Sequence, residues 1–275
     1  MSGEEFRALR YTIFDPSGNI TALVESPVEI DRQPAAAAAL MRRHPAVEQV
    51  GFVRLDRDGP ALRMAGGEFC GNAAMSAAAL YLLRASQAEI GESRTVRLRV
   101  SGTAEPVEVR LLRESAESFR GGVCMPRALE IRETEFGFEN VRGTLPLVRM
   151  EGISHILIEP DSAFFPLCRD RAAAERAVRA WCEALEADGL GLMFLEGAAP
   201  AQRLTPLVYV PGSGTVFWES SCASGSSAVG MALAARRNAA VSLTLEEPGG
   251  ELRVESDPES GETWLRGRTR LTATY

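Results

Sequence analysis

The chain contains no lysine, because all thirty of its basic residues are arginines. Pyridoxal-phosphate enzymes usually hold their cofactor as a Schiff base on a lysine amine, so this chemistry is excluded by its usual route. A Walker-type phosphate loop is excluded as well, since it requires a Gly-Lys pair. Whatever reaction the chain catalyses must work without either group.

Metal ligands are also scarce. There are only two histidines, His44 and His155, and neither lies at ligand spacing from a cysteine or from the other histidine. The five cysteines form no CxxC pair, so no metal site is expected. Their odd number also argues against a full disulfide framework.

Several partners and compartments are disfavoured in the same way. No apolar run is long enough to cross a bilayer, so no membrane partner is expected. The net charge is -7, and no arginine cluster alternates with aromatic residues, which argues against nucleic acid. The first residues lack the basic and apolar regions of a secretion signal, so we expect a cytoplasmic protein with reduced thiols.

Hydrophobic residues make up 45% of the 275 residues, which is typical of a globular protein with one large or two ordinary domains. Apolar spacing predicts an amphipathic helix over about 170–186. A shorter helix is predicted over 35–40, with Asp31 as its cap and Pro34 in its first turn. Short strands are predicted between the helices, the first over 6–14, so the expected class is α/β.

Two cysteines open similar stretches of sequence. Cys70 begins CGNAAMSAAAL and Cys222 begins CASGSSAVGMAL, and each stretch predicts a helix of small residues, over 73–84 and 226–236. A Leu-Arg-Val triplet follows each cysteine at a similar interval, ending at Val100 and at Val254. This repeat predicts an ancient duplication with two similar α/β halves, although chance similarity between Ala/Ser-rich helices is the alternative.

A cysteine at the start of a helix lies beside unpaired backbone N–H groups and the positive end of the helix dipole. Both favour the thiolate, and the same N–H groups can bind a carboxylate. Two such cysteines on opposite faces of an amino acid could remove its α-proton from one side and return a proton from the other. Cys70 and Cys222 are therefore the candidate catalytic pair. The alternative is that they are buried small hydrophobes, which is our interpretation of the three other cysteines.

The residues around these cysteines, GEFCGNAAMS and ESSCASGS, resemble the two cysteine motifs of the diaminopimelate-epimerase-like superfamily. Within it, the chain is similar to the histidine racemases of staphylopine-type metallophore biosynthesis, over nearly its full length. Supporting stretches are PSGN, EQVGF, PLVYVP and PGG. The resemblance implies two pseudo-symmetric halves, each a curled sheet around a central helix, with the active site at their junction. It also implies two-base racemisation of an amino acid, a small-molecule substrate, without a cofactor.

The resemblance also implies roles for individual residues. Cys70 and Cys222 would be the base and the acid. The α-carboxylate and amine would be held by residues next to them: Gly71, Asn72, Ser224 and Gly225. Asn19 would lie near the pocket. Glu48 and Glu219 are candidates for binding the α-ammonium or the side chain of the substrate, although Glu48 could equally be a solvated loop carboxylate.

The chain departs from diaminopimelate epimerase where that enzyme has a Glu-Arg pair before its second cysteine. Ser213 and Gly214 stand there instead, so the arginine that would bind a distal carboxylate of the substrate is missing. Ala223 and Ala74 stand where glycine and threonine are expected, and Ala223 puts the shape of the carboxylate site in doubt. Histidine is therefore favoured over diaminopimelate as the substrate.

Three alternatives stay open: epimerisation of diaminopimelate or hydroxyproline by the same cysteines, a non-catalytic binding protein on this scaffold, and a redox switch through a Cys70–Cys222 disulfide. The expected domains are 1–125, completed by the last strand over 264–275, and 126–263. The chain could form a homodimer.

Overall fold

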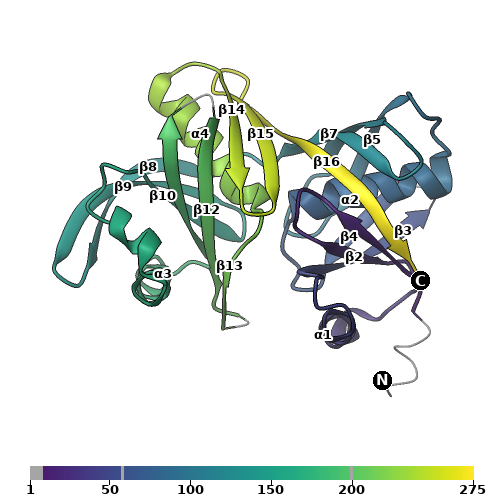
Figure 1. Cartoon of the computed structure of the whole chain (residues 1–275), viewed down its shortest axis with the longest axis horizontal. Helices are drawn as coiled ribbons and strands as arrows, with labels where there is room; N and C mark the ends of the chain where they lie inside the picture. Colours follow the sequence, from purple (N-terminus) through teal and green to yellow (C-terminus); the bar gives the residue numbers. More distant parts are fainter. Residues whose placement is uncertain (1–8, 57–58, 199–200, 213) are drawn as a thin grey trace. The chain divides into compact units, whose positions relative to one another are not determined.

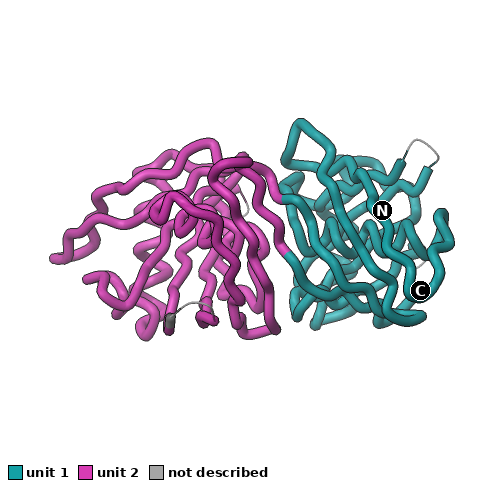
Figure 2. Tube along the Cα trace, turned by 90° about the horizontal axis from the view of Figure 1, so that it is seen from above, with its two compact units in different colours: residues 1–124, 266–275 teal, residues 125–265 magenta. Residues whose placement is uncertain are grey.

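The structure is a computed structural model that describes residues 9–56, 59–198, 201–212 and 214–275 (Figure 1). Residues 6–8 of the first predicted strand, and Ser213, lie outside these ranges. The chain divides into two compact units, coloured separately in Figure 2. Unit 1 contains residues 1–124 and 266–275, and unit 2 contains residues 125–265.

Unit 1 is a strongly curved sheet with two helices. Its elements are β1 (Tyr11–Asp15), β2 (Thr21–Val24), α1 (Gln33–Arg43), β3 (Gln49–Asp56), β4 (Gly59–Met64), α2 (Gly71–Tyr81), β5 (Ser93–Val100), β6 (Val107–Arg113), β7 (Ser118–Met125) and the end of β16 (Glu262–Thr274). The strands follow one another in chain order from β1 to β7, and β16 comes next. Because β16 also pairs with β1, the eight strands close into a barrel.

Unit 2 has the same kinds of element. They are β8 (Glu130–Phe138), β9 (Val141–Met150), β10 (Ile153–Ile158), α3 (Arg171–Ala184), β11 (Leu190–Ala198), β12 (Ala201–Val210), β13 (Thr215–Trp218), α4 (Ala223–Arg237), β14 (Val241–Glu247), β15 (Gly250–Asp257) and the beginning of β16. The sheet runs in the order β8-β9-β10-β11-β12-β14-β15-β16, and β13 pairs with the side of β12.

The two units repeat one topology. In unit 1, α1 joins the parallel pair β2–β3 and α2 joins the parallel pair β4–β5. In unit 2, α3 joins the parallel pair β10–β11 and α4 joins the parallel pair β12–β14. Each parallel crossover uses a helix, as parallel strands require. The predicted α/β class and the predicted pair of similar halves are therefore confirmed.

One detail of the predicted repeat is wrong. The sequence comparison made Val100 equivalent to Val254, but these residues lie on β5 and on β15. The strand that follows α4 and pairs in parallel with its predecessor is β14, so β14 is the counterpart of β5. The matching Leu-Arg-Val triplets reflect the common alternation of strands and not a shared ancestral position.

The cysteine-bearing helices are buried on nearly all sides. Every residue of α2 from Gly71 to Leu80 is buried, and so are most residues of α4 from Ala223 to Ala234. A helix without a polar face belongs in a core, and Ala, Gly and Ser side chains let the surrounding strands approach it closely. At Gly230, for example, an added Cβ would collide with Val254 of β15.

The other two helices lie on the outside of their units (Figure 1). The predicted amphipathic helix is confirmed as α3, and the Asp170 carboxylate caps it by accepting the Ala173 N–H at 3.0 Å. Its inward face packs Ala177, Val178 and Trp181 into the core of unit 2. Helix α1 also forms, but the predicted cap is wrong: Asp31 lies in a short 3-10 turn, and Arg32 precedes the helix without a capping side chain.

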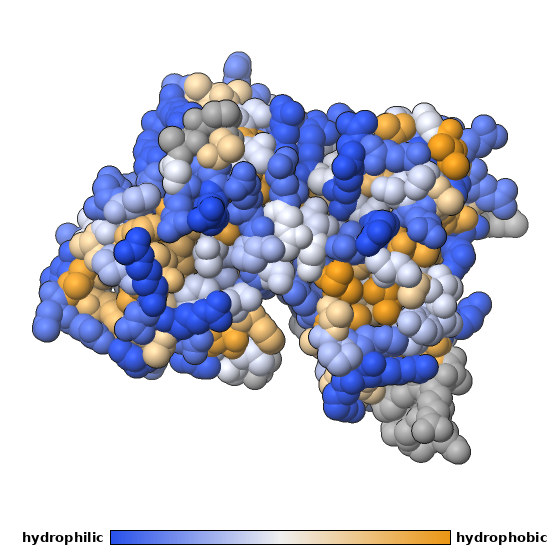
Figure 3. Space-filling model, in the orientation of Figure 1, coloured by the Kyte–Doolittle hydropathy of each residue, from blue (hydrophilic) through white to orange (hydrophobic). Residues whose placement is uncertain are grey.

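No helix within the described residues is long and apolar enough to cross a membrane. On the face seen in Figure 3, hydrophilic residues are spread over the surface of each unit, with smaller apolar patches between them.

Candidate active site

Cys70 is the N-cap residue of α2. Its extended backbone (φ -137°, ψ 115°) turns the side chain back over the first turn, where Sγ accepts the Ala73 N–H at 3.4 Å. The sulfur therefore takes the place of the hydroxyl or carboxylate oxygen that normally caps a helix. Its side chain is partly exposed. A thiol in this position is both accessible and directed at backbone donors.

Cys222 has the same geometry at the start of α4. Its backbone is extended (φ -123°, ψ 96°), and Sγ accepts the Gly225 N–H at 3.4 Å. The Ser224 hydroxyl lies 3.7 Å from the same sulfur. Cys222 is only 5% exposed, so it is much more enclosed than Cys70. The two thiols thus occupy equivalent places in the repeat but differ in burial.

The environment of Cys222 does not favour the thiolate, contrary to the prediction from the helix start alone. Burial raises its pKa well above the usual 9.0, and the nearby carboxyls of Glu219 and Glu247 raise it further. The Gly225 N–H lowers the pKa but is outweighed. A single N–H at 3.4 Å stabilises negative charge weakly, whereas burial and two acidic neighbours all penalise it. Cys222 is a protonated thiol at neutral pH.

A polar network lies in the half that carries Cys70. The Asn19 amide donates to the Glu48 carboxylate at 2.8 Å, and its carbonyl oxygen accepts the Asn72 amide at 3.3 Å. Asn72 is the second residue of α2 and is fully buried. The structure therefore brings together Asn19, Glu48 and Asn72, three of the residues predicted for the site. Glu48 is an exposed loop residue, as the alternative interpretation expected, and its carboxylate accepts the Asn19 amide N–H.

Sequence reasoning missed Gln49 as part of this network. Its amide donates to Asn19 at 2.5 Å and to the Thr21 hydroxyl at 2.7 Å. A polar residue opening a strand beside Glu48 is the signal that could have revealed it. Because Gln49 donates to the Asn19 carbonyl oxygen, the Asn19 amide nitrogen is the atom that faces Glu48.

The remaining predicted residues occupy the two helix starts. Gly71 is the first residue of α2, and Ser224 and Gly225 are the second and third residues of α4. The first N–H groups of a helix have no carbonyl partner within it, so Gly71 and Ser224 can donate to a carboxylate, whereas the Gly225 N–H donates to the Cys222 sulfur. Gly225 has a further constraint, because an added Cβ would collide with Met193 and lie 3.1 Å from the Cys222 sulfur.

Two carboxyls flank Cys222. Glu219 was predicted for the site, and it lies close enough to the thiol to hydrogen-bond it and raise its pKa. Glu247 was not predicted, although it is 93% buried and accepts the Cys222 backbone N–H at 2.5 Å. The strand pattern carried a signal: Val241, Leu243 and Leu245 alternate inward, and Glu247 continues that alternation.

The other cysteines lie elsewhere. Cys182 is buried in α3, where its S–H donates to the Ala187 carbonyl at 3.3 Å, and burial raises its pKa. Cys168 lies in the short 3-10 helix before α3, and burial raises its pKa too. Cys124 lies on β7. Among the residues that the structure describes, no cluster of three or more His, Cys, Asp or Glu side chains could hold a metal ion.

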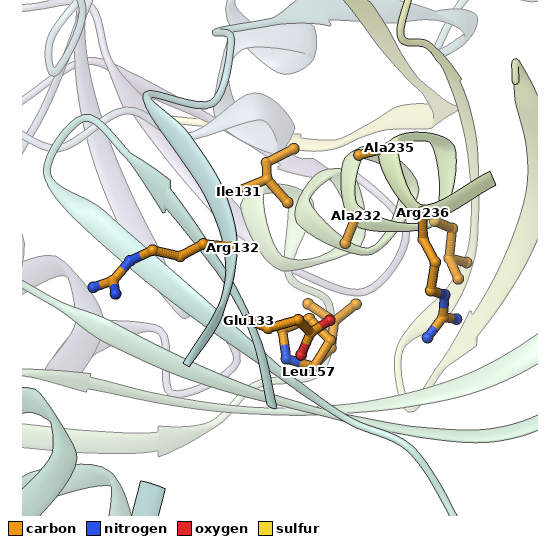
Figure 4. A pocket seen from close by; sticks show the side chains of 9 residues that line it. Ile131, Arg132, Glu133, Leu157, Ala232, Ala235 and Arg236 are labelled. Carbon is orange, nitrogen blue, oxygen red and sulfur yellow. The ribbon is translucent and has the colours of Figure 1, made fainter. Parts of the chain in front are cut away.

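A pocket of about 240 Å³ lies at the opposite end of α4 from Cys222 (Figure 4). It is lined by residues of β8, by Leu157 of β10 and by the last turns of α4, including Ala232 and Arg236. Ten residues separate Cys222 from Ala232, which is about 15 Å along the helix at 1.5 Å per residue. The pocket is therefore separate from the cysteine site, and it contains no nucleophile among its lining residues.

Comparison with known proteins identifies the family of the chain. Residues 8–268 match the profile of the histidine racemase CntK N-terminal domain. The chain is 27% identical to the histidine racemase of Staphylococcus aureus, over 91% of this chain and 89% of that protein. It is 28% identical to the histidine racemase of Fusobacterium nucleatum subsp. nucleatum, over 97% of this chain and 96% of that protein.

The fold has solved counterparts. A protein of Pseudomonas aeruginosa described as a predicted epimerase superposes with a TM-score of 0.68 at 16% sequence identity, covering 98% of both chains. At that identity the similarity is one of fold alone. It shows that the repeat of two curled α/β units is the architecture of an epimerase-like fold.

Proposed function

The chain belongs to the histidine racemase family, and we propose that it interconverts L-histidine and D-histidine through Cys70 and Cys222 without a cofactor. The enzyme is an isomerase of the racemase and epimerase class. One observation carries the residue assignment: two topologically equivalent helices each begin with a cysteine whose sulfur accepts an N–H three residues on, both at 3.4 Å.

In the proposed reaction, the Cys70 thiolate takes the α-proton of the substrate and becomes a thiol. The electron pair left on Cα is delocalised onto the substrate carboxylate, and Cys222 donates its proton to the opposite face of Cα. The product has inverted configuration, and the enzyme is left with a Cys70 thiol and a Cys222 thiolate. The reverse direction uses the same steps with the two sulfurs exchanged. This mechanism requires both sulfurs to reach one Cα from opposite faces.

The helix starts supply the stabilisation that this carbanion needs. Backbone N–H groups at Gly71, Asn72 and Ser224 are proposed to bind the substrate carboxylate, where negative charge increases as the proton leaves. Gly225, whose N–H donates to the Cys222 sulfur, is proposed to leave room for the carboxylate beside it. Donors fixed by a helix need no reorganisation during the reaction, so they stabilise the transition state more than mobile water does.

Glu48 and Glu219 are proposed to bind the cationic parts of histidine, which are the α-ammonium and the imidazole when it is protonated. Asn19 holds the Glu48 side chain at 2.8 Å. A carboxylate held in place attracts a cation without losing side-chain entropy on binding. The setting proposed with this activity, an opine-type metallophore pathway in the cytoplasm, follows from the resemblance alone. A homodimer is part of the same proposal and is tested by gel filtration.

Circular dichroism of L-histidine tests the proposal. The reduced protein is expected to bring the signal to zero, whereas Cys70→Ser and Cys222→Ser leave it unchanged over the same time. Cys168→Ser is the matched control, because it removes a partly exposed thiol outside the helix starts, and its activity is expected to equal that of the unmodified protein. A persistent signal with the unmodified protein would reject histidine as substrate, and activity in either serine variant would reject the two-thiol mechanism.

A further inference from the structure

Glu247 is a buried carboxyl directly behind a catalytic cysteine. It ends β14 on the inward face of the strand and is only 7% exposed. Its Oε2 accepts the backbone N–H of Cys222 at 2.5 Å, and its Oε1 makes a short hydrogen bond with the Ser226 hydroxyl. The side chain therefore ties the end of β14 to both the N-cap and the first turn of α4. A carboxyl in this environment occupies a costly position that packing alone would fill with an apolar residue.

The titratable groups near this carboxyl are Glu219 and the Cys222 thiol, and both are acids. Glu219 lies near both Glu247 and the Cys222 thiol. Burial raises the pKa of Glu247 to about 8, against the lowering effect of its hydrogen bonds to Ser226 and Cys222. Glu247 therefore carries its own proton at neutral pH and becomes charged only in alkali. Its charge would then lie beside the Cys222 thiol, where it opposes formation of a thiolate.

The other unit has a different structure at the corresponding place. There the chain after β5 contacts the residues before Cys70 through Ser101 and Gly102. The Ser101 hydroxyl donates to the Glu68 carbonyl at 2.7 Å, and an added Cβ on Gly102 would lie 2.7 Å from the Glu68 carbonyl carbon. A serine and a glycine thus stand near the start of α2, where a carboxyl stands at the start of α4. The two units share the order of strands and helices, but a carboxyl contacts the residue that begins α4, whereas Ser101 and Gly102 contact the residues before α2.

We propose that Glu247 is a positioning residue that fixes Cys222 at the start of α4 and, once it is ionised in alkali, opposes ionisation of the Cys222 thiol. If the proposed racemase function is correct, on which this consequence rests, Cys222 is the proton donor of the resting enzyme and Cys70 is the base. The enantiomer whose α-proton faces Cys70 can then react with the resting enzyme directly, before the two thiols have to change their protonation states. Burial makes the two equivalent thiols chemically unequal, and Glu247 extends this difference into alkali.

The test is the pH dependence of Cys222 alkylation in Glu247→Gln. Glutamine has nearly the same shape, and its amide oxygen can still accept the Cys222 N–H, but it cannot become charged. Cys222 thiolate is therefore expected at lower pH in the variant, with the alkylation profile moved by at least about one pH unit. Labelling with iodoacetamide between pH 6 and 10.5 is followed at each cysteine by peptide mass spectrometry. Glu246→Gln is the matched control, because Glu246 is its exposed neighbour.

An unchanged Cys222 profile in Glu247→Gln would overturn the proposal, and so would an equal shift in Glu246→Gln. Glu247→Ala separates position from charge, because it removes both hydrogen bonds, and it is expected to lower activity further than Glu247→Gln does. In the glutamine variant the alkaline limb of kcat/KM is expected to move with the alkylation profile, whereas a merely structural role would lower the whole curve without moving it. The labelling needs no substrate, so a shifted profile in a protein that racemises no amino acid would reject the proposed function and keep the role of Glu247.

Discussion

His155 is expected to make the stability of the fold fall in mild acid, and His155→Leu is expected to remove this effect. The imidazole lies on β10, is fully buried, and has no hydrogen-bond partner for either ring nitrogen among the described residues. It fits beside Gly191 of the neighbouring strand, because a Cβ there would collide with the ring. Burial lowers its pKa from 6.5 to about 3. Leucine has a similar volume and suits apolar surroundings.

The sign follows from the lowered pKa. Between about pH 3 and 6.5 the unfolded chain binds a proton at His155 and the folded chain does not, so the free energy of unfolding rises with pH. The stabilisation is complete above pH 6.5 and is lost as the pH falls. From pH 6.5 to pH 5 the loss is about 2 kcal/mol, at 1.36 kcal/mol for each pH unit.

Urea denaturation at pH 7.5 and pH 5 measures this loss in the reduced protein. The free energy of unfolding of the unmodified protein, relative to His155→Leu, is expected to fall by about 2 kcal/mol between the two pH values. Titration of the other groups cancels in this difference. Ile156→Val is the control: it removes a buried methylene next in sequence at a cost of about 1 kcal/mol, and that cost should not depend on pH. A pH-independent difference for His155→Leu as well would refute the reasoning.

Four further outcomes are expected. The free energy of unfolding of the unmodified protein, relative to Glu247→Gln, should fall as the pH rises from about 4.5 to 8, because burial raises the pKa of this carboxyl from 4.5 to about 8; urea denaturation of both proteins across this range measures it. Gly191→Ala should destabilise the fold by about 1–3 kcal/mol in the same assay, since its methyl group would displace the His155 ring. Asn19→Ala should lower kcat/KM about tenfold by releasing Glu48, whereas Asn140→Ala, at an exposed turn, should not. Cys182 should resist iodoacetamide at pH 8 until the protein is denatured, because its thiol is buried and its pKa is raised; labelling of the native protein would contradict this.

The features that sequence predicted best are local. A cysteine followed by a run of small residues predicts a helix that other elements can approach closely, although the helices begin at Gly71 and Ala223, before the predicted starts at 73 and 226. The two N-cap geometries at Cys70 and Cys222 follow from that local pattern. Helix α3 was equally accessible, because its apolar period and the capping Asp170 lie within one segment.

Features that depend on contacts across the chain were missed or were wrong. The pKa of Cys222 is set by burial and by Glu247, which lies 25 residues further along the chain. Glu247 itself stands in a Glu-Glu-Pro-Gly-Gly segment that is typical of a solvated turn, and only the inward alternation of β14 marks it as buried. Nothing in the neighbouring sequence indicates that His155 is enclosed, because the space for its ring is left by Gly191 on the adjacent strand.

Racemisation of L-histidine in deuterated water tests the two-thiol mechanism most directly. In the proposed mechanism one thiolate takes the substrate proton, and the new hydrogen comes from the opposite thiol, which exchanges with solvent before the reaction. Early in the reaction, D-histidine separated on a chiral column is therefore expected to carry one deuterium at Cα, while the remaining L-histidine carries none. Equal deuterium in the two enantiomers, or D-histidine that keeps the original hydrogen, would contradict removal and return of the proton by separate thiols.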